Sequence, residues 1–345
     1  MGLGGNLLWT SVLSSIYKNT GHPITVCHKP LLSDLLCGKL YNRESSLADD
    51  PVFGSINFLR FTKKSSKSIL ARFIDVGFSI VIYPVPLKRV YERVILYWSE
   101  SRAHKGAEHL VHVDMLIHSY AETQKKDRFI WKQCGHASNA IAQNFNLKID
   151  DPMPILHFNA QEEESIRVLL EKNGLSQGQY IVVEPDTNRD WFGELRAWPF
   201  DRWQEMLEFL RQEHPDLNFV QIGVKDACKL DGVIDLRGQT NFKLAALVQR
   251  DAALFVGTEG GLMHAAAAVK VPSVILWGGV TVPEFAGYPK HHKIICKYVP
   301  CAPCGHLGWC DNNHVCMNSI SVSEVVTAVL ESVCASAYPC GDKMN

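Results

Sequence analysis

The sequence has no apolar run long enough to form a transmembrane helix. Its longest runs, at residues 78–87 and 271–280, extend for about ten residues, whereas a membrane-spanning helix needs roughly 20. The formal net charge is only −1, so the chain has no overall attraction to nucleic acid. It shows neither a basic N-terminal segment with a cleavage site nor an internal repeat. We therefore expect a cytoplasmic protein without a nucleic-acid partner.

The cysteine content argues against a disulfide framework. Eleven cysteines is an odd number, and no secretory signal accompanies them. Disulfide frameworks are typical of small secreted domains, whereas cytosolic thiols stay reduced. The sequence therefore favours free or metal-bound thiols.

Length and composition predict two packed domains. A chain of 345 residues exceeds one ordinary domain, and 46% hydrophobic with 21% charged residues is typical of a globular protein. Asp150-Asp-Pro-Met-Pro154 is a turn-rich break between two differently patterned halves. We predict domains at 1–158 and 159–335, the second with a cysteine-rich excursion at 296–317.

The second half alternates between strand and helix patterns. Short apolar segments predict strands at 180–184, 219–223, 253–257, 273–277 and 293–297. Helical periodicity predicts helices at 161–173, 200–213, 241–251, 262–269 and 323–333, the last with Ser321 and Glu324 at capping-box spacing. Such alternation predicts a parallel sheet with helices on both faces. The expected fold class is α/β, with two Rossmann-like lobes facing a cleft.

The first half is less regular. Gly4-Gly5-Asn6 predicts a glycine turn that leads into a helix at 7–19. Because such a turn normally follows a strand in an α/β protein, we expect a short strand before it. Further patterns predict strands at 24–27 and 79–85 and helices at 111–121 and 138–145.

The segment with the clearest chemistry is a glycine turn between a strand and an alanine-rich helix at 253–269. Glycines let a backbone approach a ligand closely, and free N–H groups at a helix start favour an anion such as a diphosphate. His264 lies in the first turn of this helix, where it can donate to a phosphate or a sugar. The alternative is an ordinary tight turn with a capping or core histidine.

Thr258-Glu-Gly-Gly-Leu-Met-His264, followed by alanines, resembles the donor-site signature of glycosyltransferase family 9, the heptosyltransferase family. The usual form of that signature is Asp-Ser/Thr-Gly-x-x-His-x-x-Ala-Ala. Three further segments are similar to the family's Lys-x-Trp-Pro, Leu-x-Gly-x-Thr-x-Leu and Gly-Asp-x-Leu-x-Thr motifs: Arg196-Ala-Trp-Pro199, Asp235-Leu-Arg-Gly238-Gln-Thr240 and Gly4-Gly-Asn6-Leu-Leu-Trp-Thr10. The resemblance extends over residues 1 to about 330 and is looser between 30 and 150.

The resemblance implies a GT-B type fold and an inverting glycosyltransferase. Residues 1–158 would form the acceptor-binding lobe and 159–335 the lobe that binds a nucleotide diphosphate sugar. ADP-heptose is the donor that the family implies. The acceptor would be a lipopolysaccharide-core or other glycan, lipid-linked at the inner face of the membrane, or alternatively a protein.

The candidate donor-binding residues in the segments that resemble the family are Arg196, Glu259, Gly260, Gly261, Leu262 and His264. Thr187 is a further candidate, because it follows the strand expected at 180–184 and its hydroxyl could contact a phosphate or a sugar. Arg196 stands where the family has a lysine, and a guanidinium there could bind the phosphates bidentately. Arg196 and His264 are also the expected catalytic groups on the donor side. Glu259 replaces the usual aspartate. The alternative for Arg196 is a solvated arginine at the start of a helix.

Asn6 is the main departure from the family. It occupies the position of the presumed general base, and an amide cannot accept a proton from the acceptor hydroxyl. Asp34 and Asp114 are available carboxylates, but no pattern selects either. A non-catalytic protein that keeps the nucleotide-sugar pocket is therefore a rival interpretation.

A cysteine cluster is the second strong signal. Cys301, Cys304, Cys310 and Cys316 fall within a short segment that begins with a C-x2-C pair. Four thiols so close together suit a structural zinc or iron ion. The alternatives are reduced thiols in a surface excursion and a metal-dependent interaction module.

Residues 60–72 form a basic segment without a carboxylate. Such a segment in the acceptor lobe could attract anionic membrane lipids, which would make the protein peripheral at the inner membrane. A solvated loop explains the same pattern equally well.

Overall fold

The computed structural model describes residues 3–20, 25–27, 110–112, 129, 131–142, 147–187, 193–305 and 310–337, and the following account is restricted to them. The strand expected at 79–85, the basic segment at 60–72 and the carboxylates Asp34 and Asp114 lie outside these residues. Among the described helices, none is both long enough and apolar enough to cross a membrane.

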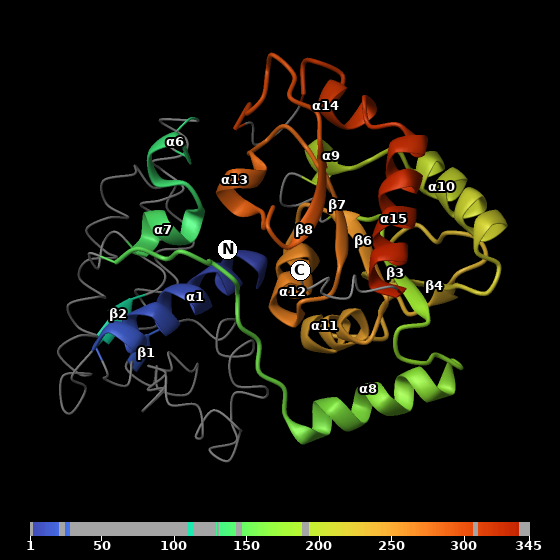
Figure 1. Ribbon diagram of the computed structural model, residues 1–345, viewed down its shortest axis with the longest axis horizontal. Helices are drawn as coiled ribbons and strands as arrows, with labels where there is room; N and C mark the ends of the chain where they lie inside the picture. Colours follow the sequence, from blue (N-terminus) through green and yellow to red (C-terminus); the bar gives the residue numbers. More distant parts are fainter. Residues whose placement is uncertain are drawn as a thin grey trace, which may run out of the picture.

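The second half of the chain builds a six-stranded sheet in the order β5-β4-β3-β6-β7-β8, in which every neighbouring pair is parallel (Figure 1). The strands are β3 (Tyr180–Glu184), β4 (Asn218–Gln221), β5 (Ile234–Asp235), β6 (Leu254–Thr258), β7 (Ser273–Trp277) and β8 (His292–Cys296). The predicted strands are confirmed to within two residues, and only the short β5 was missed. Side chains along β6 and β7 are buried on both faces, which is why these segments are continuously apolar.

Helices cover both faces of this sheet, as the alternating pattern predicts. They are α8 (Ala160–Lys172), α9 (Gly193–Arg196), α10 (Phe200–Glu213), α11 (Phe242–Arg250), α12 (Gly261–Val269), α13 (Pro283–Ala286), α14 (Val315–Asn318) and α15 (Val322–Ala337). Side chains from α8, α11 and α12 pack with Tyr180 and Val182 in one core cluster. Those from α10 and α15 pack with Ile181 and Val183 in the other, and Figure 1 shows α10 and α15 on the same side of the sheet.

Local capping explains where two of the helices begin. Asn159 Oδ1 accepts from Glu162 N at 2.9 Å, while Glu162 Oε2 accepts from Asn159 N at 2.9 Å, so a capping box starts α8. The predicted box at α15 is confirmed, since Ser321 N donates to Glu324 Oε2 at 3.0 Å. Each box satisfies N–H groups that a helix start would otherwise leave unpaired.

The described part of the first half contains α1 (Leu3–Thr20), β1 (Thr25–Cys27), β2 (Leu110–His112), α6 (Trp131–Cys134) and α7 (Ala137–Ala142). Strands β1 and β2 pair in parallel. Helix α1 contacts both α7 and α12, and Figure 1 shows it beside α12. Thr10 Oγ1 accepts a hydrogen bond from Ile155 N at 2.8 Å, which ties α1 to the segment before α8.

Two predictions for the first half are wrong. Gly4, Gly5 and Asn6 do not form a turn, because they lie inside α1. Each glycine costs a helix only about 1 kcal/mol, and α1 packs against both α7 and α12, which favours a continuous helix. Residues 111 and 112 belong to β2 rather than to a helix, because pairing with β1 overrides a short and ambiguous apolar pattern.

Candidate functional site

The strand order of the sheet reverses between β3 and β6. The chain passes from β3 to β4 and β5, and then returns to the other side of β3 as β6, β7 and β8. In doubly wound sheets, ligands bind beside the carboxyl ends of the strands at such a reversal. Glu184 ends β3 and Thr258 ends β6 at this place. The residues predicted to bind the donor follow either β3 or β6, so they lie where an α/β sheet normally holds its ligand.

The glycine turn after β6 leaves backbone N–H groups accessible at the start of α12. Gly260 is the N-cap residue, and no side chain caps this helix. Its φ of 174° is extended backbone that any residue adopts, and a Cβ would come no closer than 4.0 Å to the Thr258 carbonyl. Neither backbone conformation nor internal packing therefore requires this glycine. Its effect is to leave room beside the N–H groups of the first helical turn, which favour an anion.

Arg196, the last residue of α9, lies beside this turn. Its Nη1 donates to the Glu259 carbonyl at 3.2 Å, and its Nε is 3.9 Å from Glu259 Oε1. Thr281 Oγ1 donates to Glu259 Oε2 at 3.2 Å. Only 18% of the Arg196 side chain is exposed, so it is not the solvated arginine of the alternative interpretation. It supplies a largely buried cation next to the N-terminus of α12.

Two carboxyl groups share this guanidinium. Burial raises the pKa of Glu259 to about 7, although the Arg196 charge and the Thr281 hydrogen bond oppose the shift. Burial and the charge of Asp186 raise the pKa of Glu184 to about 8, again against the effect of Arg196. Near neutral pH, Glu184 is therefore mainly protonated and Glu259 is partly protonated. The site is less negative than its formal charges indicate, and a protonated carboxyl can donate to an anion.

The imidazole of His264 is buried and faces Tyr288. Its Nδ1 lies 2.7 Å from Tyr288 Oη, and the two rings meet edge to face with centroids 5.6 Å apart. Burial, with the charges of His136, His292 and Arg196, lowers the pKa of His264 to about 3. His264 is therefore neutral at physiological pH. As the fourth residue of α12, it can act as a neutral hydrogen-bonding group. It is not a second cation beside Arg196.

The remaining predicted site residues are Thr187, Leu262 and Asn6. Thr187 Oγ1 donates to the Gly193 carbonyl at 2.6 Å, so it ties the segment after β3 to α9 and can only accept from a ligand. Leu262 belongs to the hydrophobic core, and its contribution to a ligand site would be its backbone N–H. Asn6 lies in α1, and its side chain is outside the described residues.

The predicted metal ligands gather around one small cavity of about 20 Å³. It is lined by Cys301, Cys304, Cys310 and Cys316. Gly279 N donates to Cys316 Sγ at 3.2 Å, and His314 N donates to Cys310 Sγ at 3.4 Å. Over the ranges that the structure describes, no three His, Cys, Asp or Glu side chains are arranged to hold a metal as they stand. The four cysteines therefore share a cavity, while metal ligation itself stays a prediction.

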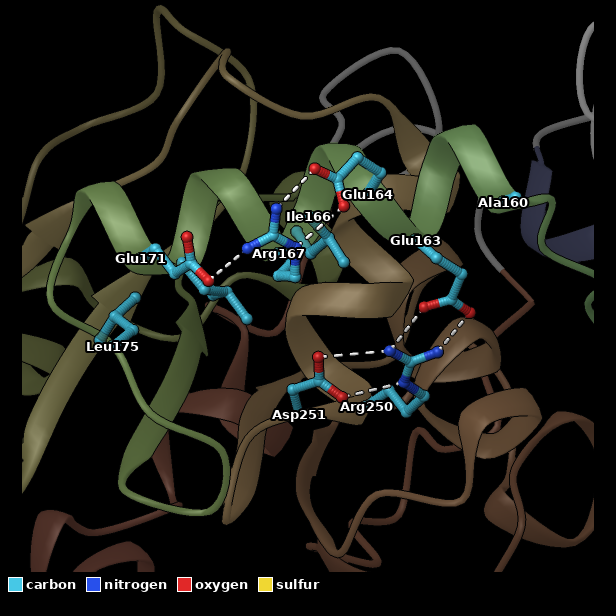
Figure 2. Close-up of a pocket in the computed structure, with 10 residues that line it drawn as sticks. Ala160, Glu163, Glu164, Ile166, Arg167, Glu171, Leu175, Arg250 and Asp251 are labelled. Carbon is cyan, nitrogen blue, oxygen red and sulfur yellow. Dashed lines mark hydrogen bonds and ion pairs between the residues drawn. The ribbon is translucent and has the colours of Figure 1, made fainter.

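A larger groove of about 590 Å³ lies away from the glycine turn, between α8 and the end of α11 (Figure 2). Its two arginines are each held by carboxylates: Arg167 by Glu164 and Glu171, and Arg250 by Glu163 and Asp251. Carboxylates outnumber guanidinium groups there, and both guanidinium groups are already paired. The groove is therefore a poor site for a diphosphate.

Sequence reasoning missed Glu184, Thr281 and Tyr288. Glu184 had a usable signal, because a charged residue ends an otherwise apolar parallel strand at the edge where ligands bind. Tyr288 had none, since its partner His264 is 24 positions earlier in the chain. Only the packing of the turn after α13 onto α12 brings the two side chains together.

Comparisons with known proteins identify the family of this chain. Residues 117–310, more than half of the chain, match the family described as glycosyltransferase family 9 (heptosyltransferase). No curated protein matches the sequence.

Solved structures that resemble this chain show which fold it has. A glycosyl transferase family 9 protein from Veillonella parvula DSM 2008 is 14% identical with a TM-score of 0.63, over 97% of this chain and 95% of that one. The E. coli heptosyltransferase WaaC, in a structure with ADP, is 14% identical with a TM-score of 0.55, over 96% of this chain and 97% of that one. At such low identities the likeness shows the fold, which is α/β and of the GT-B type, as the sequence predicts.

Proposed function

Because this chain belongs to glycosyltransferase family 9, the heptosyltransferase family, and is a glycosyltransferase, we propose that it transfers a heptose from ADP-heptose to a glycan acceptor with inversion at the anomeric carbon. One observation carries this proposal. At the reversal of strand order, a largely buried guanidinium, a neutral imidazole and an uncapped helix N-terminus come together, from Arg196, His264 and α12.

The donor diphosphate would lie against the start of α12. The N–H groups that follow Gly260 and Gly261 would donate to phosphate oxygens, and Arg196 would leave its contact with the Glu259 carbonyl to pair with the same oxygens. Thr187 and Glu259 would contribute polar contacts to the donor, and Leu262 a backbone N–H. The raised pKa values of Glu184 and Glu259 support this assignment, because protonated carboxyl groups do not repel a diphosphate.

In the proposed reaction, the acceptor hydroxyl oxygen forms a bond to the anomeric carbon on the face opposite the diphosphate. The bond from this carbon to the phosphate oxygen breaks, and ADP leaves with the electron pair. Arg196 and the α12 N–H groups stabilise the charge that develops on the leaving group. The hydroxyl proton passes to a base, which cannot be the amide of Asn6.

The acceptor side of the proposal rests on the sequence. We assign residues 1–158 to acceptor binding and 159–335 to donor binding, and Asp34 and Asp114 are the candidate bases. The acceptor would be a lipid-linked lipopolysaccharide-core sugar, which the basic segment at 60–72 would reach at the cytoplasmic face of the membrane. A protein acceptor is the alternative, and mass measurement of products from both acceptor classes separates them.

A protein that binds the donor without transferring its sugar is the main rival, because Asn6 replaces the presumed base. Both proposals expect ADP to bind, but only a catalyst releases ADP from ADP-heptose. The decisive experiment therefore combines calorimetric titration with ADP and a coupled assay for ADP release, with and without acceptor glycans. Binding without any release would favour the non-catalytic protein.

We also propose that the cysteine cavity holds one structural zinc or iron ion. Four thiols around a single small cavity, two of them accepting backbone N–H groups, support this assignment. Since Leu195 and Gly279 also line the cavity, a bound metal would brace the segments that carry Arg196 and Thr281.

A further inference from the structure

Tyr288 is surrounded by buried histidines from both halves of the chain. Its ring centroid lies 5.4 Å from that of His136, 5.6 Å from that of His264 and 5.6 Å from that of His292. Only 2% of Tyr288 is exposed, and its carbonyl accepts the backbone N–H groups of residues 291 and 292. The phenol is therefore fixed in place by its own backbone and by the rings around it.

The hydrogen bond between Tyr288 and His264 has a defined direction. A buried phenol needs an acceptor for its proton, and in the described part of the chain the acceptor within reach is His264 Nδ1, at 2.7 Å from the phenol oxygen. Burial raises the pKa of Tyr288 far above its ordinary value, so the phenol keeps its proton. His264 Nδ1 must then be the acceptor, and the neutral imidazole carries its proton on Nε2.

His264 lies directly beside the glycine turn. It is the fourth residue of α12, and its backbone N–H donates to the Gly260 carbonyl at 3.4 Å. The Arg196 charge is close enough to lower the pKa of its imidazole. Because the two ring nitrogens of an imidazole point in nearly opposite directions, the Nε2–H points away from Tyr288, which holds Nδ1.

We propose that Tyr288 is a positioning residue for the donor site. Its phenol donates to Nδ1 of His264, fixes the imidazole as the Nε2–H tautomer, and aims this N–H at the diphosphate beside Gly260. Tyr288 itself does not touch the donor, and no proton is transferred. The inference rests on the proposed donor site, because it needs an anion there to receive the hydrogen bond.

Nitrogen-15 NMR of the histidine side chains tests the tautomer directly in the protein without ligand. The His264 signals are assigned as those missing from His264→Gln. We expect Nδ1 of wild-type His264 at the chemical shift of an acceptor nitrogen and Nε2 at that of a protonated one. A ring that carries its proton on Nδ1 overturns the proposal, and this measurement requires no Tyr288 variant to fold.

Tyr288→Phe then tests the consequence for the donor. We expect a mixture of tautomers at His264 and ADP affinity lower by about 2- to 10-fold, the range of one neutral hydrogen bond. The matched control is Tyr180→Phe, which removes another buried phenol, one that donates to the Val248 carbonyl at 2.8 Å. The control should lose comparable stability but keep the wild-type tautomer and ADP affinity.

The outcomes separate this inference from the proposed function. If the wild-type protein does not bind ADP, the proposed donor site is wrong. The proposed hydrogen bond from His264 Nε2–H to a diphosphate is then wrong as well. If wild type binds ADP and Tyr288→Phe leaves both tautomer and affinity unchanged, only the inference fails. Weaker ADP binding with an unchanged tautomer also overturns it, since Tyr288 would then act by packing alone.

Discussion

Replacing Arg196 by alanine is the most direct test of the donor site. The side chain lies beside the start of α12, with Nη1 at 3.2 Å from the Glu259 carbonyl, so a small rotation would bring it to an anion at that helix end. A charge-assisted hydrogen bond contributes about 1.5–3 kcal/mol, which corresponds to a loss of roughly 10- to 150-fold in affinity. We expect a loss of this size for ADP in Arg196→Ala, measured by calorimetric titration.

The same variant should also lose some stability. Glu259 is 6% exposed, and removing its neighbouring cation makes ionisation of the buried carboxyl group still more costly. The 3.9 Å separation between Arg196 Nε and Glu259 Oε1 is longer than a hydrogen bond, so the loss should fall below the roughly 3–5 kcal/mol of a directly bonded buried pair. Thermal unfolding measures this loss separately from the ADP affinity.

Two further variants make the test specific to the contact between Arg196 and the phosphates. In Arg196→Ala with Glu259→Gln, stability should recover while ADP affinity stays low, because the neutral amide needs no cation but the phosphates still lack theirs. Arg250→Ala is the matched control, since that guanidinium pairs with Glu163 and Asp251 away from the glycine turn. An ADP affinity for Arg196→Ala equal to those of wild type and Arg250→Ala would refute the reasoning.

Three other outcomes follow from the same structure. If transfer requires a carboxylate at the position of Asn6, Asn6→Asp should raise the transfer rate by roughly 10²–10⁴-fold, and an unchanged rate in a steady-state assay means that another base already serves. Cys304→Ser should lower both the melting temperature and the zinc or iron content found by elemental analysis, and metal-free wild type of unchanged stability contradicts the metal site. The raised pKa of Glu259 means that its folded form binds a proton more tightly than its unfolded form, so its stabilising effect is complete below about pH 4.5 and is lost as pH rises through about 7. Denaturant unfolding between these values should show a smaller decline of stability with pH in Glu259→Gln than in wild type.

The C-terminal half of the fold could be predicted because its signals are local. Strands such as Tyr180–Glu184 and Ser273–Trp277 are buried on both faces, and their apolar runs are bounded by polar residues and turns. The glycine turn and Arg196 were recognised from short motifs in which spacing reflects the geometry of a strand followed by a helix. The motif segment around Arg196 also carries Trp198, which is buried and meets the buried Trp203 of α10 edge to face, with ring centroids 5.3 Å apart.

What could not be predicted depends on contacts between distant positions. The glycines at the start of α1 have the composition of a turn, but packing against α7 and α12 extends the helix through them. No motif singles out Tyr288, and its contact with His264, 24 positions earlier in the chain, exists only in the folded protein. The protonation of Glu184 and Glu259 depends on burial and on shared charges, which no linear pattern records.

The contact between α1 and α12 has a consequence for how this protein can be recombined with its relatives. The first helix of the chain packs on the helix that presents the glycine turn, and Ser138 Oγ donates to the Leu8 carbonyl at 3.1 Å, so α7 is joined to the same unit. A chimera that exchanges residues 159–335 for those of another enzyme would cut through this packing. We expect such a chimera to lose stability, and a graft that keeps this packing has to carry α1 and α7 with it.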